Sequence, residues 1–223
     1  MRTVIGDILP FAVIVMVSPI NIVAAILLLF SRRPVPNATW YLVGFVAGLA
    51  AVVAVLIVVA DAIGLSGGGD RSKTVSWLLV VLGAYLLLVA LRKFRSRPGP
   101  DDEPTLPTWM DGIAGFSPGR SLAIGAAIGA GNPKNIAVGL GTAVAVSSAG
   151  LATLDQVLTV TIYVVLASLG VAAPIITMLV LGDRAPAVLE DWKGWLTRNN
   201  AAMMAVIFLF FGVFLIGKNL GGL

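Results

Sequence analysis

The 223-residue sequence contains no cysteine and no histidine. The lack of cysteine excludes disulfides, thiol relays and thiolate metal sites. The lack of histidine removes the commonest general base, proton shuttle and metal ligand. Charge is also scarce, because only 12% of the residues are charged, whereas a soluble domain has about a quarter. We therefore expect no metal and no cofactor.

Apolar residues are in excess. They make up 58% of the chain, with a mean hydropathy of +0.99, and they occur in blocks about as long as a bilayer is thick. An open strand edge in lipid would leave backbone groups unpaired, so each block is expected to be a helix. The sequence predicts an all-α integral membrane protein with six transmembrane helices, at about 4–30, 38–63, 74–91, 121–147, 152–181 and 200–216.

A polar stretch between the third and fourth segments divides the chain. It covers residues 92–120 and carries five prolines, so it cannot form a continuous helix. We predict a first three-helix repeat at 1–92, a cytoplasmic proline-rich linker with an interfacial segment at 93–120, and a second three-helix repeat at 121–223.

The basic residues indicate the orientation in the membrane. Ten of the fifteen Lys and Arg residues lie in the first, third and fifth loops, which the positive-inside rule assigns to the cytoplasm. Both termini are then expected outside. The cluster of Lys93, Arg95 and Arg97 is interpreted as part of this topology signal, and attraction of anionic lipid headgroups is the alternative. The net charge of +4 is therefore attributed to membrane topology, and we expect no nucleic-acid partner.

One motif recurs in the two halves of the chain. The first segment contains Ser18-Pro19-Ile20-Asn21, and the fourth contains Asn132-Pro133-Lys134-Asn135. The Pro-x-Asn elements are 114 residues apart, one in each set of three helices. An odd number of helices per set places the two copies in opposite orientations. The recurrence predicts two inverted three-helix repeats, the arrangement that many secondary transporters use.

The same residues predict that the first and fourth helices are broken. Proline inside a helix removes a hydrogen bond and clashes with the preceding turn, at a cost of about 3 kcal/mol. Asparagine offers its amide to the freed backbone groups. In hydrocarbon such groups are tolerated only inside the protein or at a wet cavity, so the breaks indicate a polar site near mid-membrane. For Ser18-Pro19 alone, a simple kink is the competing interpretation.

A lone basic residue, Lys134, lies inside the fourth apolar segment. A lysine at this depth is costly and normally has a partner. The acidic residues lie in loops or near helix ends, and Asp7, Asp61 and Asp155 come nearest to mid-depth. A substrate anion is one natural partner for Lys134, and a structural bridge to Asp7 or Asp155 is the alternative.

These observations define the candidate site. The predicted substrate-binding residues are Ser18, Pro19, Asn21, Asn132, Pro133, Lys134 and Asn135. Because the chain has no histidine, proton coupling would require a carboxylate such as Asp7, Asp61 or Asp155. No convincing nucleophile or acid–base pair lies at depth, so we do not expect an enzyme.

Two further patterns concern packing and depth. Glycines recur at four-residue or similar spacing, which allows close helix packing; they are Gly44, Gly48, Gly125, Gly129 and Gly139. Tryptophans precede the fourth and sixth apolar segments, at 109, 192 and 195. They are interpreted as anchors in the headgroup region, because an indole has an apolar ring and a polar N–H.

Three patches make the sequence resemble the GAP (glycolipid-addressing protein, or Sap) family of the LysE superfamily of small exporters. They are the Pro19-x-Asn21 region with its aliphatic run to Arg32 and Arg33, the stretch from Trp109-Met110 through Phe116-Ser117-Pro118 to Asn132-Pro133-Lys134-Asn135, and Trp195-Leu196-x-x-Asn199. The resemblance implies six helices in two inverted triplets, a bacterial cytoplasmic-membrane location, and a role in delivering envelope glycolipids or related amphiphiles outward.

We therefore expect an exporter that moves an anionic or amphiphilic envelope lipid or glycolipid by alternating access. Two alternatives stay open: an exporter of amino acids or other small polar solutes, and a non-transporting accessory subunit of a lipid-export assembly. The expected partners are membrane lipids and the substrate, together with further copies of the chain or a larger lipid-export complex.

Overall fold

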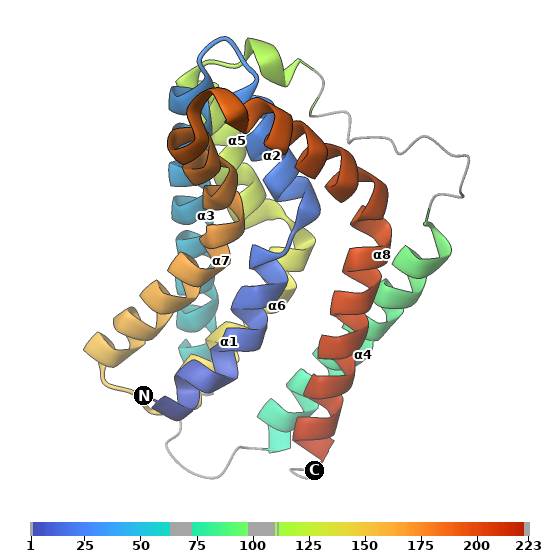
Figure 1. Ribbon diagram of the computed structural model, residues 1–223. Helices are drawn as coiled ribbons and strands as arrows, with labels where there is room; N and C mark the ends of the chain where they lie inside the picture. The colour runs from blue at the N-terminus through green and yellow to red at the C-terminus, as the bar shows by residue number, and fades with distance from the viewer. Residues whose placement is uncertain (1, 63–72, 98–109, 111, 221–223) are drawn as a thin grey trace.

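In the computed structural model, the described residues are 2–62, 73–97, 110 and 112–220, and every element among them is a helix (Figure 1). The α-helices are α1 (Arg2–Met16), α2 (Pro19–Leu29), α3 (Pro34–Ala62), α4 (Lys73–Arg95), α5 (Pro118–Gly131), α6 (Pro133–Ser147), α7 (Thr153–Leu181) and α8 (Ala185–Leu220). Two short 3₁₀ helices are η2 (Ile113–Gly115) and η3 (Gly182–Arg184). The all-α prediction is confirmed. Part of the predicted linker, residues 98–109 and 111 with Trp109 among them, lies outside the described residues.

Several helical runs are long and apolar enough to cross a bilayer. They are Pro34–Ala62, Val75–Arg95 and the continuous run Thr153–Leu220, and the bent pair formed by α1 and α2 is a fourth candidate. The pair α5 and α6, with 14 and 15 residues, is rich in glycine and carries two basic residues, and it is not among these candidates. The helices thus support a membrane protein with three or four apolar spans, and the six-span arrangement stays a prediction.

Both predicted helix breaks are confirmed. α1 ends at Met16 and α2 begins at Pro19, with a bend of 51° between them. α5 and α6 are separated by Asn132 alone, which has an extended backbone conformation. Each second half starts with its proline, a position where the missing N–H is not needed. Pro10 and Pro174, by contrast, lie inside continuous helices, so proline alone does not end a helix here.

Glycine brings α3 and α5 into backbone contact. A Cβ on Gly44 would collide with the carbonyl oxygen of Leu122, and a Cβ on Gly125 would collide with that of Tyr41. Gly48 and Gly129 continue the same contact one turn along each helix. The close-packing prediction is confirmed for these four glycines. The fifth, Gly139, faces only side chains of α3.

The last helix differs from its prediction. α8 begins at Ala185, well before the expected start near residue 200, so Trp192 and Trp195 lie within the helix and not before it. The reason is that Gly182, with a φ of 51°, ends the preceding helix and Pro186 lies in the first turn of α8, where proline is tolerated. Figure 1 shows the first part of α8 crossing one end of the bundle before the helix descends beside α4.

Candidate functional site

The break between α5 and α6 is closed by its own asparagines. The side-chain oxygen of Asn132 accepts a hydrogen bond from the backbone N–H of Lys134 at 3.0 Å, which caps α6. The buried amide of Asn135 donates to the carbonyl oxygens of Ile128 at 3.0 Å and Gly129 at 3.2 Å. These carbonyls belong to the last turn of α5, where helix geometry leaves them without a partner. The two asparagines therefore join the ends of the broken helix.

The break between α1 and α2 has different partners. Ser18 is the N-cap of α2 but makes no capping hydrogen bond. Asn21 is buried, and neither atom of its amide group has a hydrogen-bond partner among the described residues. The ammonium group of Lys134 donates instead to the carbonyl oxygen of Ile14, near the end of α1, at 3.4 Å. A side chain from the second break thus contacts the first, and the two breaks lie together.

A cavity of about 240 Å³ lies where the two breaks meet α4 and α8. Its lining residues are Ser18, Ile20, Tyr85, Leu86, Val89, Lys93, Asn132, Pro133, Lys134, Asn200, Met204 and Phe208. Four of the seven predicted binding residues are therefore in the lining. The other three, Pro19, Asn21 and Asn135, lie at the breaks but are not part of the lining.

The sequence did not lead us to predict the cavity-lining residues on α4 and α8. On α4 the lining includes Tyr85, Val89 and Lys93, and on α8 it includes Asn200, Met204 and Phe208. Members of each set are four residues apart, so they share one helix face. This periodicity, with a polar residue at one end of an otherwise apolar stripe, is the signal that could have found them.

The cavity is positively biased. Lys93 and Lys134 line it, and among the described residues no carboxylate does. A second cavity of about 420 Å³, between α2, α7 and α8, has the opposite character: Asp191 lines it, together with Trp192 and Trp195, and its described lining includes no lysine or arginine. Of the two, only the cavity at the helix breaks combines ammonium and amide groups suited to an anion with aliphatic walls suited to a hydrocarbon chain.

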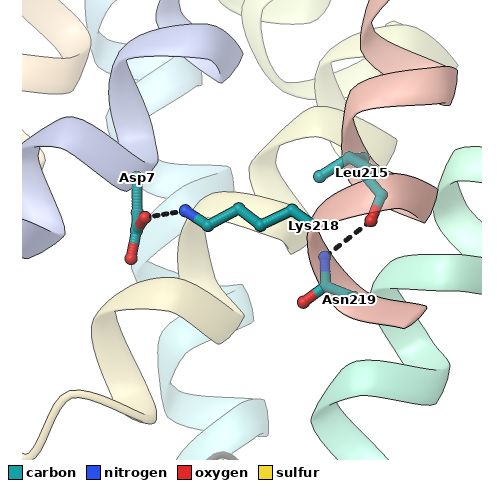
Figure 2. Close-up of polar contacts among 4 residues, drawn as sticks. All are labelled: Asp7, Leu215, Lys218 and Asn219. Carbon is teal, nitrogen blue, oxygen red and sulfur yellow. Dashed lines mark hydrogen bonds and ion pairs between the residues drawn. The ribbon is translucent and has the colours of Figure 1, made fainter. Parts of the chain in front are cut away.

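The three candidate carboxylates lie away from this cavity. Asp7 forms an ion pair with Lys218, next to which Asn219 donates to the carbonyl of Leu215 at 2.7 Å (Figure 2). The alternative of a structural bridge from Lys134 to Asp7 or Asp155 is therefore wrong, since the Lys134 ammonium contacts the Ile14 carbonyl.

The other two acids lie at helix ends. Asp61 is half-buried in the last turn of α3, and one of its carboxylate oxygens has no partner within the described part of the chain. Asp155 is in the first turn of α7, where its backbone oxygen accepts a hydrogen bond from Thr159 at 2.6 Å. Their proposed part in proton coupling stays a prediction.

Comparison with known proteins agrees with the sequence resemblance. The family model described as Sap, sulfolipid-1-addressing protein, matches residues 8–221. No curated protein and no solved structure matches the chain. The family match covers nearly the whole length, including both helix breaks and the residues that line the cavity between them. Together with its apolar helices, it shows that the chain is a membrane protein and belongs to the Sap, sulfolipid-1-addressing protein, family.

Proposed function

We propose that this protein exports an anionic or amphiphilic envelope lipid or glycolipid across the bacterial cytoplasmic membrane. The observation that carries the proposal is the cavity shared by both helix breaks, with Lys134 between them. The Lys134 ammonium contacts a backbone carbonyl and no carboxylate among the described residues. A charge in such a place needs compensation, and an anionic headgroup supplies it.

The ends of the broken helices support the same ligand. Ser18 and Ile20 bring the amino-terminal end of α2 to the cavity, and Asn132 and Lys134 bring that of α6. An amino-terminal helix end carries partial positive charge and N–H groups without helical partners. The headgroup would thus contact Lys134 and the amides of Asn132 and Asn200, which line the cavity, while the hydrocarbon chain lies along the aliphatic side chains of α4 and α8.

Alternating access between two inverted triplets is the mechanism that we propose. One triplet would be α1/α2, α3 and α4, and the other α5/α6, α7 and α8. Reciprocal packing supports this division: α5 meets α3 of the other triplet through Gly44, and α1 meets α7 of the other triplet through Gly170, whose Cβ would collide with the Met16 carbonyl. Rocking of one triplet against the other would open the cavity to each side in turn.

Orientation and coupling follow from the charges. Under the positive-inside rule both termini would lie outside, which places the end of α4 with Lys93 toward the cytoplasm. Proton coupling would use Asp7, Asp61 or Asp155. Because none of these carboxylates lines the cavity, coupling would act through helix movement and not through contact with the headgroup.

Reconstitution tests the proposal. The purified protein is placed in liposomes that contain a fluorescent phosphatidylglycerol, and movement of the lipid between leaflets is followed by quenching from outside. Lys134→Ala should abolish movement without loss of membrane insertion, and Lys134→Arg should restore little, because the bulk and geometry of the two cations differ. Lys193→Ala is the matched control, since Lys193 pairs with Glu190 on α8 and lines neither cavity.

Each alternative gives a distinct result. Normal lipid movement by Lys134→Ala would contradict the proposed anion site. Efflux of a labelled amino acid without lipid movement would favour the small-solute exporter. An inserted wild-type protein that moves neither would favour the accessory subunit, whereas lipid movement without partners would exclude it.

A further inference from the structure

We infer that Lys93 is a second anion-binding residue of the cavity and that the cavity therefore prefers a headgroup with two negative charges over one with a single charge. This inference rests on the proposed function, because it names the headgroup class that the same cavity takes. The observation behind it is that two lysines, from helices far apart in the sequence, line one cavity, and that no carboxylate from the described part of the chain lines it.

Lys93 differs from the basic residues around it. It lies in the last turn of α4 with Arg92 and Arg95, and both arginines are exposed and outside the lining. Arg97 stacks over the ring of Phe94 at 4.2 Å. The positive-inside signal accounts for the cluster as a whole but does not require that one member point into a cavity. Of the basic residues in this cluster, Lys93 is the one that lines the cavity.

The second step concerns charge. The ion pairs among the described residues are Lys193 with Glu190 and Lys218 with Asp7, so neither Lys93 nor Lys134 has a carboxylate partner there. Two like charges at one cavity repel each other, and the repulsion grows as water is displaced. A ligand with one negative charge compensates one ammonium group. A ligand with two compensates both and removes the repulsion, so the doubly charged headgroup gains more.

The packing of α4 and α8 places a third polar group near Lys93. The two helices meet at Gly83 and Gly212, where a Cβ on either glycine would lie 2.9 Å from the carbonyl oxygen of the other. Figure 1 shows the two helices running in opposite directions. Ten residues further along α4, Lys93 therefore lies at about the level of residue 202 on α8, close to Asn200. Lys93 and Asn200 thus extend the headgroup site, which begins with Lys134 at the helix breaks, toward this end of the cavity.

The rest of the α4 and α8 wall, apart from Tyr85, is apolar and suits a hydrocarbon chain. Below Lys93 and Asn200, the α4 and α8 wall includes Val89 and Leu86 on α4 and Met204 and Phe208 on α8. The ligand class is thus an amphiphile whose headgroup is a phosphate monoester or carries two separate anionic groups.

Equilibrium binding to the full-length protein in a neutral detergent tests the inference. The probes are radiolabelled dodecyl phosphate and dodecyl sulfate, which share a chain and a tetrahedral headgroup. At about pH 7 they differ by nearly one charge, since a phosphate monoester then carries close to two. We expect dodecyl phosphate to bind about tenfold more tightly, the size of one charge-assisted contact. Inorganic phosphate should compete at least tenfold more weakly than the ester, because it lacks the chain.

Two lysine variants separate this inference from the proposed function. Lys93→Gln should reduce the preference for dodecyl phosphate to less than about twofold and leave dodecyl sulfate binding nearly unchanged, whereas Lys93→Arg should keep the preference. Lys134→Gln should weaken both probes about tenfold. Arg95→Gln, at an exposed neighbour of Lys93, is the matched control and should change neither.

The contradicting results are also distinct. A Lys93→Gln variant that keeps the tenfold preference, or a wild type without one, would overturn the role of Lys93 while leaving the Lys134 site in place. A Lys134→Gln variant that binds both probes normally would overturn the proposed function itself. Competition by inorganic phosphate as strong as that by the ester would overturn the amphiphile assignment.

Discussion

The two helix breaks carry the same Pro-x-Asn pattern but are held together differently. At the break before α6, Asn132 caps the new helix and Asn135 donates to two carbonyls of the old one. At the break before α2, Ser18 forms no cap, and the amide of Asn21 has no partner within the described residues. At the second break the cap and both Asn135 N–H donors find partners within its own half, and only the Asn135 side-chain oxygen lacks one among the described residues, whereas at the first break both amide atoms of Asn21 lack a partner there.

This difference between the breaks indicates that Lys134, besides facing the cavity, also connects the two breaks. Ile14 and Ile128 hold equivalent places, each seven residues before the asparagine of its Pro-x-Asn element. The Ile128 carbonyl accepts the Asn135 amide from its own half of the chain, whereas the Ile14 carbonyl accepts the Lys134 ammonium from the other half. Lys134 thus links the two breaks, and a ligand that contacts it acts on both.

The largest expected difference concerns the glycines beside the breaks. Gly170 of α7 faces the Met16 carbonyl at the first break so closely that a Cβ would collide with it, whereas a Cβ on Gly131 at the second break meets nothing within 4 Å. Gly170→Ala should destabilise the protein by about 3 kcal/mol, because two backbones must separate. Gly131→Ala should be neutral or slightly stabilising. Thermal unfolding in detergent measures the stability of both variants. Equal losses of stability for Gly170→Ala and Gly131→Ala would contradict the difference in packing between the two breaks.

A smaller difference is expected for the two asparagines. Asn135→Leu removes an amide that joins two carbonyls to the start of α6 and should cost about 2 kcal/mol. Asn21→Leu replaces a buried amide that has no partner among the described residues, so its effect should stay below about 0.5 kcal/mol or be stabilising. The two substitutions have the same shape change, which makes each the control for the other. A larger loss of stability for Asn21→Leu than for Asn135→Leu would contradict the difference in hydrogen bonding between the two asparagines.

The smallest expected difference concerns the caps. Asn132→Ala removes the hydrogen bond to the Lys134 backbone and should cost about 1 kcal/mol. Ser18→Ala should have little effect, because Ser18 makes no capping hydrogen bond in α2. Helix content and the unfolding midpoint, measured side by side, test the pair. A Ser18→Ala loss as large as that of Asn132→Ala would mean that the first break is capped after all.

Features with a local signal could be predicted from the sequence. Pro19 and Pro133, each followed by asparagine, predicted both breaks, and the spacing of Gly44 and Gly48 predicted a close helix contact. The depth of Lys134 predicted a polar site, since an isolated ammonium group in an apolar segment is costly unless it faces a polar partner or a cavity.

Features that depend on how helices pack could not be predicted in this way. Lys93 and Asn200 line the cavity because α4 and α8 pack beside the breaks. The four-residue spacing on each helix marks a shared face, but it does not tell which other helices that face meets. The partner of Lys134 is a backbone carbonyl, that of Ile14, and every residue carries one. The early start of α8 was missed because its first half is polar, while the prediction followed apolar segments only.

The most direct test of the anion site uses the absence of cysteine from the chain. Lys134→Cys introduces a single thiol, which can be converted to a cationic side chain with aminoethyl methanethiosulfonate or to a neutral one with methyl methanethiosulfonate. Binding of radiolabelled dodecyl phosphate is then measured for the unmodified and the two modified proteins. We predict that the unmodified and neutral forms bind poorly and that the cationic adduct restores binding. Equal binding by the neutral and cationic adducts would contradict the anion site.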